Sequence, residues 1–414
     1  MENLDKYYKL AFAYKKKKLW TRIDDNNIFA IKLDDGQIGL VSILGSSGEY
    51  NSINLYPGLE SILYFKDIFE IDDIVSDYDK FLSTLDSTYY QLVLGNRIDI
   101  TKKEADDIKA YKKKNSLNIR GSLSMPYFRK STPFVPMVEF NKKEDYHYIE
   151  QALEASLALA DILEEKSPKD IGLGIMPLED KLILLEKLNG KYVLSDTIDI
   201  DWKNNSFYTR ADMVYMSTAK KLKKLRKKTD VECKLIALSN PVYEKGSDPY
   251  YPQLLLALEK RRGTIIPVKP IKNYRKNPNA AVNNFLESIM KEGLKPVKIS
   301  VSDKRTYFLL EDTCMSLKID LVLDKDLYEL EMTRREFDAK FSGNPYNDSS
   351  IGDMMIEILD QLDNLKDMKN MGESIPDEII YLIADSVISG EFDNEFKNLV
   401  MTRLDELSDY KLFN

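Results

Sequence analysis

The chain has 414 residues, of which 43% are hydrophobic and 31% are charged, a composition typical of globular proteins and unlike that of disordered or fibrous ones. No apolar run approaches the roughly 18 residues that a membrane-spanning helix needs, and charged residues stand where a signal peptide would be apolar. We therefore expect a cytoplasmic protein without membrane association. The two cysteines, Cys233 and Cys314, do not form a CxxC motif, so the sequence indicates neither a thiolate zinc site nor a disulfide framework.

The net charge of -8 is unevenly distributed along the chain. Residues 341–414 hold 16 acidic and 5 basic residues, a net charge of -11, which leaves a net charge of +3 for the rest. This distribution argues against a nucleic-acid binder recognised by overall charge, so nucleic acid is not the expected partner. Two local basic stretches, 15–18 and 220–228, could still meet phosphates or an acidic partner, including the protein's own tail. A solvated helix face explains both stretches more simply.

A strand meander is predicted near the start of the chain. Apolar residues 28–33 and 37–44 flank the dipeptide Asp35-Gly36, which favours a tight primed hairpin turn with positive φ angles. A third strand is predicted at 53–56, and helical spacing of apolar residues follows it. The first region therefore begins with three strands and continues with helices.

The remainder of the first region mixes strand, helix and extended chain. Residues 89–95 have the composition of a strand, and Thr101 with Glu104 forms a capping box that opens a helix ending at Lys114. Three prolines in residues 120–140 exclude a regular helix there. We expect this stretch to lie extended over a surface, anchored by its aromatic side chains.

A helix is predicted at 144–165, and a break after it suggests a domain boundary near residue 166. Asn189-Gly190 then predicts a second hairpin, and a helix starting near Ala211 is expected to continue through the basic stretch 220–228. The later elements are predicted in this order: a strand at 231–240, two strands around the turn 260–263, a helix at 279–292, a strand at 296–302, a helix at 304–317 and a strand at 319–323. Alternation of strands and helices favours parallel pairing with right-handed crossovers.

The last part of the chain is predicted to be wholly helical, with helices at 350–370, 376–390 and 392–409. The expected organisation is an N-terminal α/β domain (1–165), a second α/β domain (166–339) and an acidic helical module (340–414). The predicted fold class is thus mixed α/β, with a meander-plus-helix first region and a helical C-terminal module.

Several motifs in order along the chain carry a resemblance. They are LGSSGE followed by INLYPG, then QLVLGNR, RGSLSMPYFR with PFVP, and LKPVKISVS before a helix and IDLVL. In that order they resemble a bacterial family of unknown function, over roughly residues 5–335. The resemblance implies a cytoplasmic location and carries over no active site, because no catalytic residues are defined for such a family. The helical tail lies outside it.

The candidate catalytic residues are carboxylates, because His147 is the only histidine and excludes every mechanism that needs two. The element order of residues 253–324 resembles the ribonuclease-H-like superfamily, which implies acids on the first strand and after a later strand holding Mg²⁺. Glu259 and Asp303 are the acids available in this unit. The expected first strand, LLLALE, is apolar where the central aspartate should be, and Asp303 equally fits the N-cap of a helix.

Three further sets of residues are candidate ligand contacts. Asp199 and Asp201, at alternate positions of a predicted strand, could hold a divalent metal ion or simply line an exposed strand face. Backbone N–H groups at two glycines beside a carboxylate could approach a ligand, or the glycines could serve turn geometry alone. An anion-binding edge is the third candidate, with stacking of arginine on Tyr127 or Phe128 as its alternative. The glycine set consists of Gly45, Gly48 and Glu49, and the anion-binding edge consists of Arg120 and Arg129.

From these patterns we predict a non-enzymatic interaction or scaffold protein that needs no cofactor. Its expected partner is a protein, bound through the helices of 340–414 or through the tyrosine-rich loop 243–251. The alternative is a divalent-metal-dependent phosphodiesterase or nuclease of ribonuclease-H-like type, in which Glu259 and Asp303 would bind Mg²⁺ for catalysis.

Overall fold

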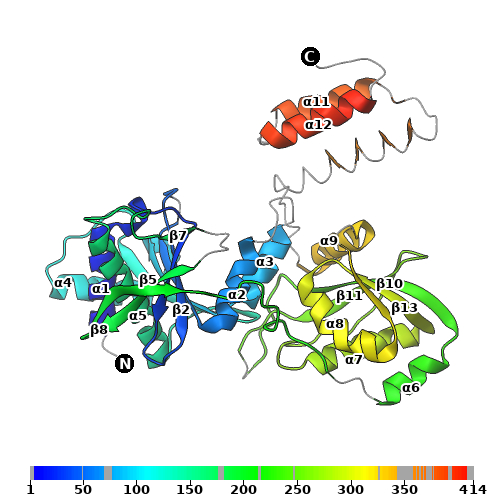
Figure 1. Ribbon diagram of the computed structural model, residues 1–414, viewed down its shortest axis with the longest axis horizontal. Coiled ribbons are helices and arrows are strands. Elements are labelled where there is room, and N and C mark those ends of the chain that lie inside the picture. The colour runs from blue at the N-terminus through cyan, green and yellow to red at the C-terminus, as the bar shows by residue number, and fades with distance from the viewer. Residues whose placement is uncertain are drawn as a thin grey trace. The chain divides into compact units, whose positions relative to one another are not determined.

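The structure is a computed structural model that describes residues 4–48, 50–69, 77–175, 181–212, 216–245, 248–324, 327–342, 377–389 and 394–407, with isolated positions between 358 and 375 (Figure 1). The chain divides into two compact units, one of residues 1–70 and 82–341 and the other of residues 71–81 and 342–414. Both sheets belong to the first unit. The mixed α/β fold class predicted from the sequence is confirmed.

The first sheet has nine strands within the described residues, in the order β6-β5-β4-β3-β2-β1-β8-β9, with β7 also paired to β1. Neighbouring strands are antiparallel, except that β1 and β8 are parallel. The strands are β1 (Asn27–Lys32), β2 (Ile38–Leu44), β3 (Ser52–Pro57), β4 (Tyr89–Gly95), β5 (Met125–Thr132), β6 (Val135–Glu139), β7 (Gly174–Ile175), β8 (Leu182–Leu188) and β9 (Lys191–Ile198).

Both predicted hairpins of this sheet are confirmed. At the second, Asn189 and Gly190 both have positive φ, at 51° and 77°, as a primed turn requires. At the first, only Gly36 has a positive φ, of 85°, and the N–H of Leu33 donates to the carbonyl of Gln37. The first turn therefore differs from the primed geometry that Asp35-Gly36 predicted, although the strand pairing is the same.

Helices cover both faces of the first sheet, which explains why its central strands are buried along almost their whole length. On β1, Phe29 and Ile31 belong to one buried cluster with α1, α4 and α5, whereas Ile28 and Ala30 belong to another with α2. The capping box predicted at Thr101 and Glu104 is confirmed at the start of α4. The helices of this region are α1 (Asp5–Lys17), η1 (Leu19–Thr21), α2 (Gly58–Phe69), α3 (Asp77–Asp86), η2 (Arg97–Asp99), α4 (Lys102–Lys114) and α5 (Lys143–Ile162).

The proline-containing stretch 120–140, expected to lie extended over a surface, instead contributes the hairpin of β5 and β6 to the sheet. Pro126 stands near the start of β5, and Pro136 lies on β6, the edge strand. Proline is tolerated at both kinds of position because no ladder hydrogen bond is lost there.

The first sheet also extends past residue 166, the boundary proposed from the sequence. In β8, Leu184 and Leu185 pair in parallel register with Ala30 and Ile31 of β1. Residues on both sides of position 166 thus share one sheet, and the three-domain division stays a prediction.

The second sheet has the order β12-β11-β10-β13-β14. Strands β10, β13 and β14 are parallel, whereas β11 and β12 are antiparallel to their neighbours. Because β10 is the central strand, this unit begins one strand earlier than the position 253 inferred from the sequence. Its elements are α6 (Met216–Lys224), β10 (Lys227–Ala237), β11 (Gln253–Glu259), β12 (Thr264–Ile266), α7 (Pro278–Lys291), β13 (Leu294–Val301), α8 (Lys304–Leu317), β14 (Asp320–Leu323) and α9 (Tyr328–Ser342).

The basic stretch 220–228 is divided between a helix and a strand. Helix α6 ends at Lys224, and Lys227 and Lys228 pair with Leu294 and Lys295 of β13 in parallel register. The expectation of one helix through residue 228 is therefore wrong, because the last two lysines hydrogen-bond in the sheet.

In the second unit, helices α11 (Asp377–Ser389) and α12 (Asn394–Leu407) confirm two of the three helices predicted there. Their apolar residues share a core that includes Ile380, Val387, Val400 and Leu404. The helix predicted at 350–370 lies mostly outside the described residues. Among the helices that the structure describes, none is long and apolar enough to cross a membrane.

Candidate functional site

The carboxyl ends of β10, β13 and β14 meet at one edge of the second sheet, where open α/β sheets ordinarily bind their ligands. Helix α8 begins at this edge, capped by Asp303. The Asp303 carboxylate accepts hydrogen bonds from the Thr306 N–H at 2.8 Å and from the Thr306 hydroxyl at 2.7 Å. Thr306 Oγ1 in turn accepts from the N–H of Leu235 on β10 at 2.8 Å. Asp303 is thus engaged as an N-cap, the simpler of its two predicted roles.

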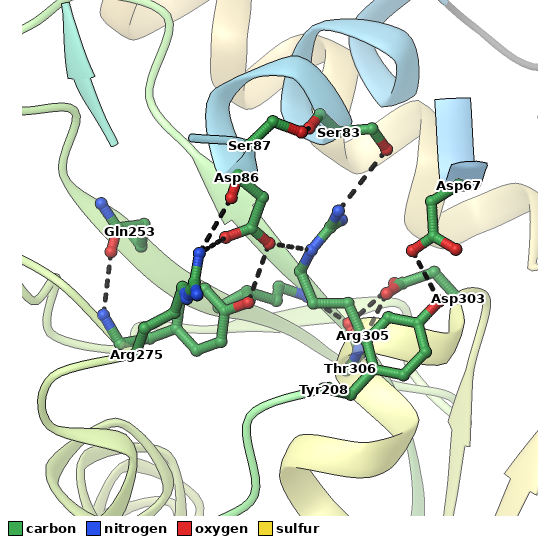
Figure 2. A network of polar contacts seen from close by, with 12 residues as sticks. Asp67, Ser83, Asp86, Ser87, Tyr208, Gln253, Arg275, Asp303, Arg305 and Thr306 are labelled. Atoms are coloured by element: carbon green, nitrogen blue, oxygen red, sulfur yellow. Dashed lines mark hydrogen bonds and ion pairs between the residues drawn. The ribbon is translucent and has the colours of Figure 1, made fainter. Parts of the chain in front are cut away.

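A carboxylate from the first region closes the same edge. Asp86, the last residue of α3, has an exposed fraction of 0%. Its Oδ2 accepts from Arg305 Nε at 2.5 Å and from the Tyr274 hydroxyl at 2.9 Å (Figure 2). Arg305 and Tyr274 are themselves buried, so this charged group lies entirely inside the protein.

A second guanidinium, that of Arg275, lies against the same aspartate. Its Nη1 donates to the backbone carbonyl of Asp86 at 2.9 Å and is 3.5 Å from Asp86 Oδ1. It also pairs with Glu60 and lies 4.8 Å from the centre of the Tyr64 ring. Arg275 therefore joins α2 and α3 to the loop between β12 and α7.

That loop is positioned by Gln253, the first residue of β11. Gln253 Oε1 accepts from the backbone N–H of Tyr274 at 3.0 Å, and the backbone groups of Gln253 and Ile271 exchange two hydrogen bonds. Figure 2 shows Gln253 beside Arg275, at the edge of the polar network. Strand β11 thus holds Tyr274 and Arg275 toward Asp86.

Burial and charge pairing act in opposite directions on these groups. Burial raises the pKa of Asp86, and Arg305 opposes this rise. Burial alone would lower the pKa of Arg305, but Asp86 raises it well above its ordinary value, so the guanidinium stays charged. Burial and the neighbouring Arg305 lower the pKa of Arg275 to about 10. The centre of the network, Asp86 with Arg305 and Tyr274, is buried, whereas Glu60 on its outer side is exposed. Such an ion cluster can fasten chain segments together.

The two predicted catalytic carboxylates are not brought together. Glu259 pairs with Val231, the fifth residue of β10, whereas Asp303 follows Val301, which pairs with Cys233. Asp303 therefore lies about four residues farther along β10 than Glu259, a separation of roughly 13 Å at about 3.3 Å per residue. Glu259 is buried and accepts a hydrogen bond from the Thr229 hydroxyl.

The central strand of this sheet also has no acid on its apolar face. Val231, Cys233 and Leu235 alternate along β10 and are buried. Burial raises the pKa of the Cys233 thiol well above its ordinary value, which keeps it protonated and unreactive. In the part of the chain that the structure describes, no group of three or more His, Cys, Asp or Glu side chains is placed to hold a metal ion.

The predicted glycine-rich ligand site is already occupied by an internal carboxylate. Asp25 Oδ1 accepts from the N–H groups of Gly45 at 2.7 Å and of Ser46 at 2.8 Å. Gly45 has a φ of 135°, and a Cβ there would lie 2.5 Å from Asn51 Oδ1, so a glycine is required for the turn itself. Gly48 has a φ of 86° in open space, and Glu49 lies outside the described residues.

At the predicted anion-binding edge, one of the two arginines forms an ion pair within the protein. Arg129 Nη1 and Nη2 donate to the two oxygens of Glu104 at 2.6 and 3.2 Å, and its guanidinium lies 4.6 Å from the Tyr127 ring centre. The stacking alternative is therefore the one that the structure contains. Arg120 is exposed and forms no ion pair with the residues that the structure describes.

Asp199 and Asp201 do not share a strand face, because β9 ends at Ile198. Both are exposed. The only histidine, His147, lies half exposed with its Nε2 3.2 Å from Asp34 Oδ2, a surface contact that matches its predicted solvated role.

The predicted partner loop 243–251 is described except for residues 246 and 247. Val242 and Tyr250 bridge its base, and Lys272 Nζ lies 4.4 Å from the Tyr250 ring centre. Tyr243 projects with 75% of its surface exposed.

Sequence reasoning missed Asp86, Tyr274, Arg275 and Arg305. Asp86 and Arg305 are 219 positions apart, and each has an ordinary local role, at the end of one helix and the start of another. No spacing rule links such residues, so the sequence held no signal for their pairing.

Comparison with protein families finds two matching regions, and both families are described as domains of unknown function. Residues 5–171 match DUF7309 and residues 218–338 match DUF6930. A search of curated proteins finds no match. The resemblance to an uncharacterised family is thereby confirmed, and the second match begins close to the start of α6.

Among solved structures, two of the HTLV-2 integrase catalytic core domain in complex with magnesium are similar to this chain. The dimeric form has 14% identity and a TM-score of 0.21, over 31% of this chain and 81% of that chain. The trimeric form has 14% identity and a TM-score of 0.20, over 46% of this chain and 91% of that one. At these scores the likeness carries no argument about function.

Proposed function

We propose that this chain is a non-enzymatic interaction or scaffold protein, in which the two sheets of the first unit are fastened together and present surfaces to a partner. The observation that carries the proposal is the burial of Asp86. Asp86 has an exposed fraction of 0%, and its carboxylate binds Arg305 at the carboxyl edge of the second sheet. This is the edge at which open α/β sheets ordinarily bind a ligand.

The energetics of this pairing favour a structural role. Removing one partner of a buried ion pair leaves an uncompensated charge inside the protein, at a cost of about 3–5 kcal/mol. A group held so strongly by Arg305 and Tyr274 is not free to bind substrate, metal ion or product.

The alternative function, a divalent-metal phosphodiesterase or nuclease, is favoured by the element order of the second sheet. It would require Mg²⁺ held by Glu259 and Asp303 together. Their separation by about four residues along β10, and the engagement of both side chains by neighbouring hydroxyl groups, speak against that arrangement. The proposed function accordingly requires no metal ion.

Calorimetric titration of Mg²⁺ and Mn²⁺ into the full chain, with a nuclease assay on single- and double-stranded substrates, separates the two functions. The matched variant is Asp303→Asn, because asparagine caps a helix about as well as aspartate and should leave the fold intact. We expect neither saturable metal binding nor cleavage in either protein. Binding and cleavage that both disappear in Asp303→Asn would establish the enzyme and overturn the proposal.

The partner surfaces that we propose are the loop around Tyr243 and the helices of the acidic tail. Tyr243 and, on α11, Tyr381 and Leu382 are exposed large side chains of the kind that anchor protein interfaces. We further propose a cytoplasmic location, with which the free, buried thiols of Cys233 and Cys314 are compatible.

A further inference from the structure

The amino end of the second sheet gathers basic side chains from four segments. Helix α6 ends two residues before β10 begins, and the first residues of β10 pair with those of β13. The turn between β11 and β12 lies at the same end, because Glu259 pairs with Val231 and the N–H of Lys260 donates to the carbonyl of Asp230. The cations at this end, called the basic edge below, are Lys224, Lys227, Lys228, Lys260, Arg261, Arg262 and Lys295.

Most of these cations have no acidic partner among the residues that the structure describes. Lys260 pairs with Glu232 at 3.0 Å, and Arg262 Nε lies 3.8 Å from Glu259. Within the described parts of the chain, no ion pair neutralises Lys228 or Arg261, and both are exposed. The exposed carboxylates Asp230, Glu292 and Asp320 lie at the same end of the sheet, but the cations outnumber them, so the basic edge keeps a net positive charge facing solvent.

A hollow of about 270 Å³ lies within the basic edge. It is lined by Lys228, Thr229, Asp230, Lys260, Arg261 and Val297. Two buried carboxylates fix its walls, since Glu232 holds Lys260 and Glu259 accepts from the Thr229 hydroxyl. The hollow is thus a supported feature of the sheet end, with Lys228 and Arg261 free to meet an anion.

The composition of the basic edge identifies the anion that it suits. The segments that form this end contain no aromatic residue; they are 216–231, 259–264 and 291–298. Beside them, the described chain exposes one large apolar side chain, that of Ile265. A protein partner would need apolar or aromatic anchors, and a single-stranded nucleic acid would need aromatic stacking platforms. Phosphate groups of a duplex backbone need only cations.

We propose that the basic edge binds the phosphate backbone of a double-stranded nucleic acid without reading its sequence. This inference goes beyond the proposed function, because it adds a surface to those proposed above and names the partner class of that surface. It departs from the expectation, drawn from total charge, that nucleic acid is not a partner. The acidic tail conceals the basic edge in that total. Residues 341–414 have a net charge of -11, whereas the rest of the chain has a net charge of +3.

Fluorescence anisotropy with a labelled DNA duplex of about 20 base pairs tests the proposal in the full chain. The test variant is Lys228→Glu with Arg261→Glu. The control is Lys102→Glu with Lys103→Glu, which changes the net charge equally at two exposed lysines in the first turn of α4, where acidic residues are well tolerated. We expect the test variant to bind the duplex at least tenfold more weakly and the control less than twofold more weakly.

The salt dependence gives a second readout. Four phosphate contacts predict a slope of log affinity against log salt concentration of about -3.6, and loss of two contacts reduces the slope to about -1.8. Equal weakening in both variants would show that only total charge matters, and absence of duplex binding at about 50 mM salt would also overturn the proposal. Tighter binding of polyglutamate than of the duplex would assign the edge to an acidic protein instead.

Cleavage is measured separately from binding in the same samples, with and without Mg²⁺. Duplex binding that disappears in the test variant, without cleavage, supports both proposals. Cleavage of the duplex would overturn the non-enzymatic function while leaving the assignment of the basic edge to be decided by the variants alone.

Discussion

The two ends of the second sheet use charge in opposite ways. At the carboxyl end, Asp86 and Arg305 pair at 2.5 Å with no exposure of the carboxylate, whereas at the amino end Lys228 and Arg261 face solvent without an acidic partner. A buried charge contributes to the stability of a fold when an opposite charge is held beside it. An exposed charge, in contrast, can interact with another molecule. The carboxyl end of β10 therefore suits a role in stability, and the amino end suits the binding that we propose for it.

The largest effect is expected from Asp86→Ala, which leaves the buried Arg305 guanidinium without its anion. We expect the free energy of unfolding to fall by about 3–5 kcal/mol. Urea unfolding followed by circular dichroism measures the change. The double variant Asp86→Leu with Arg305→Met should recover most of the loss, because it removes both charges; a loss below about 1 kcal/mol in the single variant would contradict the structural role.

A smaller loss is expected from Tyr274→Phe, which removes one hydrogen bond to the Asp86 carboxylate and keeps the ring. A hydrogen bond to a charged group contributes about 1.5–3 kcal/mol. The same unfolding measurement applies, with Tyr243→Phe as the control, since the exposed Tyr243 should show no change. Equal effects in the two variants would mean that the carboxyl end contributes nothing particular to stability.

Between the two ends, the pair of Lys234 on β10 and Glu331 on α9 should make stability depend on pH. Burial alone would raise the pKa of Glu331, but Lys234 and Arg334 outweigh it and lower that pKa below its ordinary value of 4.5. This stabilisation is present above the ordinary pKa and is lost as pH falls below about 4.5 through the lowered value. We expect Glu331→Gln to abolish about 1 kcal/mol of pH-dependent stability, measured by unfolding between pH 6 and pH 3.

The smallest effect on stability is expected at the amino end. The double substitution of Lys228 and Arg261 by glutamate should change the free energy of unfolding by no more than about 0.5 kcal/mol, because both side chains are exposed. A thermal melt of the same samples used for anisotropy provides the measurement. Destabilisation comparable to that of Asp86→Ala would remove the contrast between the two ends.

The parts of the fold that could be predicted from the sequence are those set by local rules. The Asn189-Gly190 hairpin, the capping box at Thr101 and the cap of α8 at Asp303 each depend on residues within a few positions of one another. Helix α8 was accordingly predicted with both of its ends in place.

What could not be predicted depends on pairing across long separations. A long loop separates β10 from β11 in the sequence, so local pattern alone makes the apolar LLLALE of β11 the first strand of the unit. The candidate site of Glu259 and Asp303 follows from that assignment, since only the strand register shows that the two residues lie about four residues apart along β10. The Asp86 network depends on two residues that no local pattern relates.

The parallel pairing of β1 with β8 has a consequence for how the chain must be made. Ala30 finds its partner Leu184 only after the intervening chain has been synthesised, which takes about 8–30 s at about 5–20 residues per second. Until then β1 is an unprotected apolar edge, open to strand addition from another chain. A fragment ending at residue 171, where the first family match stops, would retain that edge permanently, whereas one ending after Ile198 would include the strands that close it.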